Sequence, residues 1–127
     1  MKKLAKKTIM IVEDEEPLLR VIAMKLEHAG FHTVSVKSVE QALDYIEEID
    51  NVDLIWLDHY LQGDYDGIAL LGRLDDMGIK IPVFLVSNTS YPDKHQTYIA
   101  MGAEKYYTKS NFKLSQIIED VVSYLGA

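Results

Sequence analysis

The sequence contains no cysteine among its 127 residues. Disulfide bonds, thiolate metal sites and cysteine nucleophiles are therefore excluded. No apolar stretch approaches the roughly 20 residues that are needed to span a bilayer, so no transmembrane helix is expected. Basic side chains are outnumbered, 13 against 20 acidic ones, and the net charge of −7 argues against generic nucleic-acid binding by the domain as a whole. Linkers, repeats and low-complexity segments are also missing, which favours a single domain.

The N-terminus is basic, with lysines at positions 2, 3, 6 and 7. This start is similar to that of a signal peptide, but the apolar run at residues 8–12 ends in an acidic cluster and is too short to complete one. Hydrophobic residues make up 48% of the chain, so a real core is available. We therefore expect a cytoplasmic protein with one domain over residues 1–127 and a short basic tail at residues 1–6.

Short apolar runs alternate five times with helical patterns along the chain. The runs that predict buried strands are residues 8–12, 31–36, 53–58, 81–86 and 104–108. Pro17 and Pro92 suit the first turns of helices, and Ser38 with Gln41 predicts a capping box. The final segment, Leu114 to Leu125, predicts a strongly amphipathic helix. This alternation predicts a parallel sheet that is covered on both faces, with all strand-to-helix loops at one edge.

Asp58 lies where the third apolar run opens into a loop, at the carboxyl edge of such a sheet, where ligands bind. Glu13 and Asp14 follow the first strand and are expected at the same edge. Three carboxylates that gather there repel one another unless a cation is bound. Mg²⁺ is the natural candidate, because it binds one or two carboxylates, keeps several waters and completes its shell with phosphate oxygens.

Two further side chains are expected at this edge. Ser87 follows the fourth strand and could donate a hydroxyl, and Lys109 follows the fifth and could pair with a carboxylate or a phosphate. Each residue has a simpler role when taken alone: the acids as partners of helix N-termini, Ser87 as a loop hydroxyl and Lys109 as a solvated cation. Their common place at one edge favours a site for a divalent metal and a phosphoryl group.

Four segments together resemble the CheY-like receiver domain of two-component response regulators. They are IVEDE at residues 11–15, DLIWLD at 53–58 with Asp66-Gly67 beyond, PVFLVS at 82–87 and GAEKYYTK at 102–109. The resemblance covers roughly residues 7–126. It implies an α/β fold with a doubly wound, five-stranded parallel sheet of order 2-1-3-4-5 and five helices.

The resemblance also implies a role for each acidic residue. Asp58 matches the phosphoacceptor, which takes a phosphoryl group from a sensor histidine kinase or a phosphotransfer protein. Glu13 and Asp14 match the acidic pair that holds Mg²⁺, for which Mn²⁺ can substitute. Asp58 and the backbone carbonyl of Tyr60 complete the implied protein ligands of the metal.

Other positions match the residues that respond to phosphorylation. Ser87 matches the switch hydroxyl, Lys109 the lysine that contacts the phosphoryl group, and Tyr106 the switch aromatic whose ring moves inward. Asn88 and Thr89 follow the switch hydroxyl and are expected to tune access to the phosphoryl group. The implied function is a phosphorelay switch, not a dedicated enzyme, whose surface at the fourth helix, fifth strand and fifth helix contacts an output protein. We expect a monomer or weak homodimer that binds neither nucleic acid nor membrane.

The sequence departs from the family pattern in the loops. Gln62 and Ser110 stand where the family usually has prolines, the second of them cis, and the segment to Gly67 is one residue longer than usual. A cis bond before a non-proline residue costs about 3 kcal/mol. The Lys109–Ser110 bond is therefore expected to be trans, or cis through unusual packing. Tyr60 could screen the acyl phosphate from water, which predicts slow self-dephosphorylation.

Two alternatives to the phosphorelay switch stay open at this point. The departures at Gln62, Asn88 and Ser110 favour a degenerate receiver that acts as a phosphorylation-independent docking or dimerisation module. A small metal-dependent phosphohydrolase on a flavodoxin-like sheet is the other alternative, and the lack of a lid or an obvious general base argues against it. Whether the chain stands alone or belongs to a longer regulator is equally open.

Overall fold

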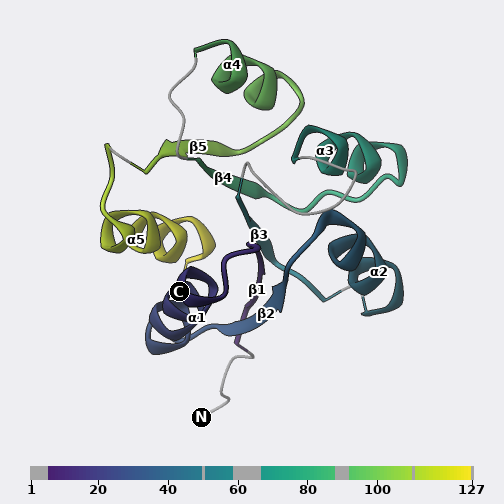
Figure 1. The fold of residues 1–127 in the computed structure, drawn as a ribbon. Coiled ribbons are helices and arrows are strands. Elements are labelled where there is room, and N and C mark those ends of the chain that lie inside the picture. The colour runs from purple at the N-terminus through teal and green to yellow at the C-terminus, as the bar shows by residue number, and fades with distance from the viewer. Residues whose placement is uncertain (1–5, 50, 59–66, 88–91, 110, 127) are drawn as a thin grey trace.

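The computed structural model describes residues 6–49, 51–58, 67–87, 92–109 and 111–126, with the backbone alone at residues 48, 49, 58, 87 and 92–95. These residues form five strands and five helices in strict alternation (Figure 1). In chain order they are β1 Thr8–Val12, α1 Glu16–His28, β2 His32–Val36, α2 Val39–Ile49, β3 Leu54–Asp58, α3 Gly67–Asp76, β4 Val83–Ser87, α4 Pro92–Ala100, β5 Lys105–Thr108 and α5 Leu114–Leu125.

The strands form one parallel sheet of order β2-β1-β3-β4-β5, which confirms the predicted fold and strand order. Helices α1 and α5 cover one face of the sheet, and α2 and α3 cover the other (Figure 1). Side chains of α4 belong to the same core as those of α2 and α3. The sheet is therefore covered on both faces, as short, continuously apolar strands require.

The sheet divides the interior into two cores, as the inner strand β1 shows. All five of its residues are buried, because β1 lies between β2 and β3 and under helices on both sides. Successive side chains of a strand point to opposite faces. Ile9 and Ile11 accordingly pack with α1 and α5, whereas Met10 and Val12 pack with α2, α3 and α4.

The start of α2 follows the predicted cap with one change. The Ser38 hydroxyl accepts a hydrogen bond from the Gln41 amide at 3.1 Å, as a capping box requires. The Gln41 side chain, however, accepts from the amide of Lys37 at 2.8 Å rather than from that of Ser38. The first bond satisfies a backbone donor of the first turn that the helix leaves without an internal partner. The second satisfies the amide of Lys37, just before the cap.

Strand β4 begins two residues later than the sequence pattern predicts. Ile81 and Pro82 are partly exposed, and proline has no amide proton to donate to a ladder. The carbonyl of Pro82 still accepts a hydrogen bond from the Ile55 amide at 2.9 Å, which aligns the two strands. At its other end β4 extends to Ser87, a residue expected to lie in the following loop.

No helix within the described ranges is both long enough and apolar enough to cross a membrane. The cytoplasmic location inferred from the sequence stays a prediction.

The buried position of Ile11 in the inner strand β1 predicts a large packing effect. Replacing it by alanine should lower the free energy of unfolding by about 2–5 kcal/mol, because the sheet cannot close around the resulting cavity. The matched control is Ile99→Ala, since Ile99 is 42% exposed on α4 and its loss should cost within about 0.5 kcal/mol. Urea unfolding followed by the fluorescence of Trp56, the single tryptophan, measures both. Equal losses in the two variants would contradict this description of the core.

Candidate functional site

The register of the strands brings the ends of β1, β3, β4 and β5 to one edge of the sheet. Val12 is aligned with Leu57, Asp58 with Val86, and Ser87 with Thr108. The residues that directly follow these strands, including Glu13 and Lys109, therefore start from the same edge. Asp58 and Ser87 themselves are the last residues of β3 and β4.

Glu13 is the most deeply buried acidic side chain among the described residues, with 1% of its surface exposed. Its backbone amide donates to the carbonyl of Val36 at 3.1 Å, which continues the β1–β2 pairing by one residue. Its carboxylate oxygen Oε2 accepts from the amide of Glu15, at the N-cap of α1, at 3.1 Å. Burying a carboxylate is costly unless it is paired, so this position requires compensation from nearby donors or cations.

Lys109 supplies one such cation. Its Nζ lies 3.8 Å from Oε1 of Glu13, and 24% of the lysine side chain is exposed. The lysine also lines a small, mainly apolar pocket of about 180 Å³, together with Leu18, Ile22, Trp56, Val86, Phe112, Leu114 and Ile117. The aliphatic part of the side chain thus packs under the sheet edge while the ammonium group reaches the buried acid.

Asp14 and Tyr106 are also placed by the structure. Asp14 follows Glu13 in the turn before α1 and is half-buried. Tyr106 lies on β5 beside Leu85, is half-buried and packs against the core between the sheet and α2, α3 and α4. Its ring centre is 6.0 Å from that of Tyr98 at an interplanar angle of 48°. The inward movement expected of Tyr106 stays a prediction.

Several predicted site residues lie outside the described part of the chain. They are Tyr60, Asn88 and Thr89, together with Gln62 and Ser110, and the side chains of Asp58 and Ser87. Within the described residues, no three acidic or histidine side chains gather closely enough to form a metal site by themselves. The predicted cluster of Glu13, Asp14 and Asp58 is therefore neither confirmed nor contradicted. Its two described members offer hard carboxylate oxygens at the expected edge, a donor set that fits Mg²⁺.

The tyrosines of the C-terminal half divide between core and surface. Tyr98 and Tyr107 are buried, whereas Tyr124 is 44% exposed. The Tyr107 hydroxyl donates to Asp120 at 2.6 Å, and the Tyr124 hydroxyl donates to Glu104 at 2.8 Å. Both bonds tie α5 to β5 or to the residue before it, and so fix the strand that carries Tyr106 and leads to Lys109.

These contacts also perturb the acidity of the two phenols. Burial and the hydrogen bond to Asp120 raise the pKa of Tyr107 well above the ordinary tyrosine value. The hydrogen bond to Glu104 raises the pKa of Tyr124 in the same direction. In both cases a neighbouring carboxylate favours the protonated, neutral phenol.

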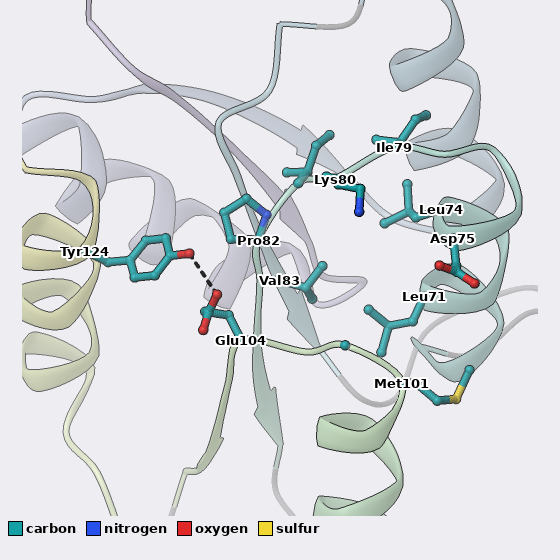
Figure 2. A pocket seen from close by; sticks show the side chains of 12 residues that line it. Leu71, Leu74, Asp75, Ile79, Lys80, Pro82, Val83, Met101, Glu104 and Tyr124 are labelled. Atoms are coloured by element: carbon teal, nitrogen blue, oxygen red, sulfur yellow. Dashed lines mark hydrogen bonds between the residues drawn. The ribbon is translucent and has the colours of Figure 1, made fainter.

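A larger pocket of about 350 Å³ lies at the opposite edge of the sheet (Figure 2). It surrounds Val83 at the start of β4 and Glu104 just before β5, and it is bordered by Asp75, Lys80 and Tyr124. The bond between Tyr124 and Glu104 forms one of its sides (Figure 2). Because it opens at the amino ends of the strands, this pocket is not part of the site at the carboxyl edge.

Comparison with known proteins agrees with this architecture. A family model described as the response regulator receiver domain matches residues 9–122. The polar-differentiation response regulator DivK of Brucella ovis is 31% identical over 122 residues, which cover 94% of this chain and 97% of DivK. The receiver domain of the Francisella response regulator 1452 superposes with a TM-score of 0.83 at 26% identity, covering 91% of this chain and 93% of that one.

The chain therefore belongs to the receiver domain family of two-component response regulators. Members of this family are generally non-enzymatic signalling modules that partner histidine kinases and typically use Mg²⁺. The phosphate regulon transcriptional regulatory protein PhoB of Pseudomonas aeruginosa is 36% identical over 105 residues, 81% of this chain but 45% of PhoB. The chain thus spans about half the length of that relative, and the expected single domain over residues 1–127 stays a prediction.

The pairing of Lys109 with Glu13 predicts a coupling between the two side chains. Lys109→Met should lower the free energy of unfolding by about 1–3 kcal/mol, because it leaves a buried carboxylate without this cation. The loss should be smaller in a Glu13→Gln background, with a coupling energy of roughly 0.5–3 kcal/mol from urea unfolding of the four proteins. Lys105→Met, at an exposed position of β5, is the control and should have little effect. If the losses in free energy of unfolding were additive, the ion pair would make no contribution to stability.

The raised pKa of Tyr107 predicts a loss of stability in alkali. When the pH rises above about 10, the unfolded chain gives up this phenolic proton first, so the free energy of unfolding falls. Below that pH both states are protonated and the effect is absent. Tyr107→Phe should remove part of the alkaline slope, and Asp120→Asn, which keeps an acceptor without its charge, should reduce it. Chemical unfolding between pH 8 and 11 measures this. Parallel slopes in wild type and Tyr107→Phe would contradict it.

Proposed function

We propose that this receiver domain is a phosphoacceptor switch, in which Asp58 takes a phosphoryl group from a histidine kinase or a phosphotransfer protein. The observation that carries the proposal is the buried carboxylate of Glu13, paired with Lys109 at the same sheet edge at which β3 ends in Asp58. A buried acid paired with a cation at a ligand-binding edge is costly to maintain for stability alone. In a phosphoryl-transfer site, both the carboxylate of Glu13 and the ammonium group of Lys109 would have a role.

In the proposed reaction, a carboxylate oxygen of Asp58 attacks the phosphorus of a phosphohistidine. A bond from that oxygen to phosphorus forms, the bond from phosphorus to the histidine nitrogen breaks, and the electron pair leaves with the imidazole. Glu13, Asp14, Asp58 and the backbone carbonyl of Tyr60 would hold Mg²⁺, which when bound offsets the negative charge on the transferred group. Lys109 would neutralise the phosphoryl oxygens from the side of β5.

The same residues would then convert the chemical change into a change of shape. Phosphorylated Asp58 carries more negative charge and more acceptor oxygens than the free carboxylate. These oxygens attract the Ser87 hydroxyl and the Lys109 ammonium group, and this pull biases the neighbouring loops toward a second arrangement. Tyr106, which lies on the strand leading to Lys109, would follow by turning inward.

The output would go through the face formed by α4, β5 and α5. The two helices of this face carry exposed apolar side chains, with Ile99 of α4 at 42% and Tyr124 of α5 at 44% exposure. Exposed apolar groups of this kind favour a protein partner over a nucleic acid, in agreement with the net charge of −7. The proposed partners are thus a phosphodonor protein at the carboxyl edge and an output protein at this face.

Phosphorylation with a small donor tests the proposal directly. Incubation with Mg²⁺ and acetyl phosphate, followed by intact mass measurement, should show the gain of one phosphoryl group in the wild type. Asp58→Asn should abolish the gain, because an amide is not a nucleophile for this transfer, and omitting Mg²⁺ should reduce it strongly. Asp76→Asn, at an exposed position of α3, is the matched control and should be phosphorylated like the wild type.

The other outcomes separate the alternative functions. No mass gain in the wild type would contradict the switch and favour a docking module that works without phosphorylation. Release of many phosphates per protein would contradict it in another way and favour a phosphohydrolase. A gain of mass that persists in Asp58→Asn would place the phosphoacceptor elsewhere.

A further inference from the structure

Tyr98 of α4 is fully buried, with none of its surface exposed. It is among the largest completely buried side chains of the described residues, and it belongs to the core between the sheet and helices α2, α3 and α4. A tyrosine in such a place brings a polar hydroxyl into an apolar core, where a phenylalanine would fill the same space without it. The surroundings of this hydroxyl therefore call for a physical explanation.

One neighbour of Tyr98 is Gly67, the first residue of α3. A Cβ atom added at Gly67 would lie 2.7 Å from the Tyr98 hydroxyl oxygen and 3.1 Å from its ring carbon Cε1. Real Cβ atoms almost never come so close to another heavy atom. The phenol thus lies directly on the backbone of Gly67, the first residue of α3.

A second neighbour is Tyr106, whose ring packs on that of Tyr98 at 6.0 Å between centres and 48° between planes. A tilted arrangement at this distance is a favourable contact for two aromatic rings. Tyr98 is therefore in contact both with the start of α3 and with the aromatic residue at the switch position of β5. These two segments lie far apart in the sequence, and one rigid side chain touches both.

We propose that Tyr98 is a positioning residue that couples the start of α3 to the orientation of Tyr106. The inference deepens the proposed function, on which it rests for the role of Tyr106. Displacing the Gly67 backbone pushes the phenol, and the phenol moves the ring packed on it, because close-packed interiors transmit such shifts rather than absorb them. The glycine at position 67 is required by the space that the phenol occupies.

A set of substitutions tests the path of this coupling. In ¹H–¹⁵N spectra of the unphosphorylated protein, Gly67→Ala should shift the amide resonance of Tyr106. In a Tyr98→Leu background the same substitution should leave that resonance where Tyr98→Leu alone places it. The matched control is Gly72→Ala in the interior of α3, where an added Cβ would meet only Met101 Cε at an ordinary 3.8 Å. This control should leave Tyr106 unshifted.

Two results of this NMR experiment would overturn the coupling. The first is that Gly67→Ala leaves the amide resonance of Tyr106 unshifted. The second is that Gly67→Ala shifts this resonance equally in the wild type and in the Tyr98→Leu protein. Tyr98→Phe provides a variant that should fold, because it removes one oxygen. Gly67→Ala should lower the melting temperature less in the Tyr98→Phe protein than in the wild type, since the 2.7 Å contact is gone. Equal losses in the two backgrounds would also overturn the proposal.

Phosphorylation gives the readout that a purely structural role would not change. Tyr98→Leu should gain the same mass as the wild type from acetyl phosphate and Mg²⁺, but its Tyr106 resonance should no longer respond to that gain. A full response of Tyr106 in phosphorylated Tyr98→Leu would overturn the coupling. If the wild type itself gains no mass, the proposed function fails, while the comparison of Gly67→Ala with and without Tyr98 still tests the coupling.

Discussion

The parallel register of five short strands is the constraint on which the rest of this structure depends. Each strand has four or five residues, and the central ones are buried on both faces. A shift of one residue in the pairing would move the apolar side chains of each core to the opposite face of the sheet. The register is therefore strongly specified. With the register fixed, the carboxyl ends of β1, β3, β4 and β5 meet at one edge. The site is a consequence of this alignment.

Keeping the buried carboxylate of Glu13 at this site lowers the free energy of unfolding. A carboxylate with 1% exposure is held by one backbone amide at the start of α1 and by an ammonium group at 3.8 Å. Replacement by an apolar residue of similar volume would be cheaper for folding. A divalent cation at the same edge would offset both this charge and that of Asp14. Under the proposed function, stability and function compete at Glu13. The net negative charge of the chain adds to the cost of burying this carboxylate.

Much of the fold could be predicted from local patterns. Alternating short apolar runs and amphipathic segments identified every strand and helix of the described chain, and resemblance to receiver domains supplied the strand order. The boundary of β4 was wrong by two residues at its start, because the apolar pattern includes Pro82 although proline cannot pair as a strand residue does. The bond of Gln41 reaches Lys37 rather than Ser38, a detail of local geometry that a sequence motif does not specify.

The roles of Tyr98 and Gly67 could not be predicted in this way. Sequence periodicity places a tyrosine on a helix face, but it does not say which distant backbone its hydroxyl will touch. A glycine before an apolar run predicts the end of a turn. In the structure, however, Gly67 leaves room between α3 and α4 for the Tyr98 hydroxyl, which a Cβ would meet. For the site itself, the sequence predicted which residues share the edge, and the structure describes Glu13, Asp14, Tyr106 and Lys109 there or next to it. The ligand roles assigned by resemblance stay predictions.

The central claim is that the acidic side chains directly after β1 and at the end of β3 share one divalent cation. Calorimetric titration of the unphosphorylated protein with Mg²⁺ at neutral pH tests it most directly. The account predicts one ion per chain and an affinity that falls at least about tenfold, equivalent to roughly 1.4 kcal/mol, in both Asp14→Asn and Asp58→Asn. Absence of binding, or affinities unchanged by either substitution, would contradict it.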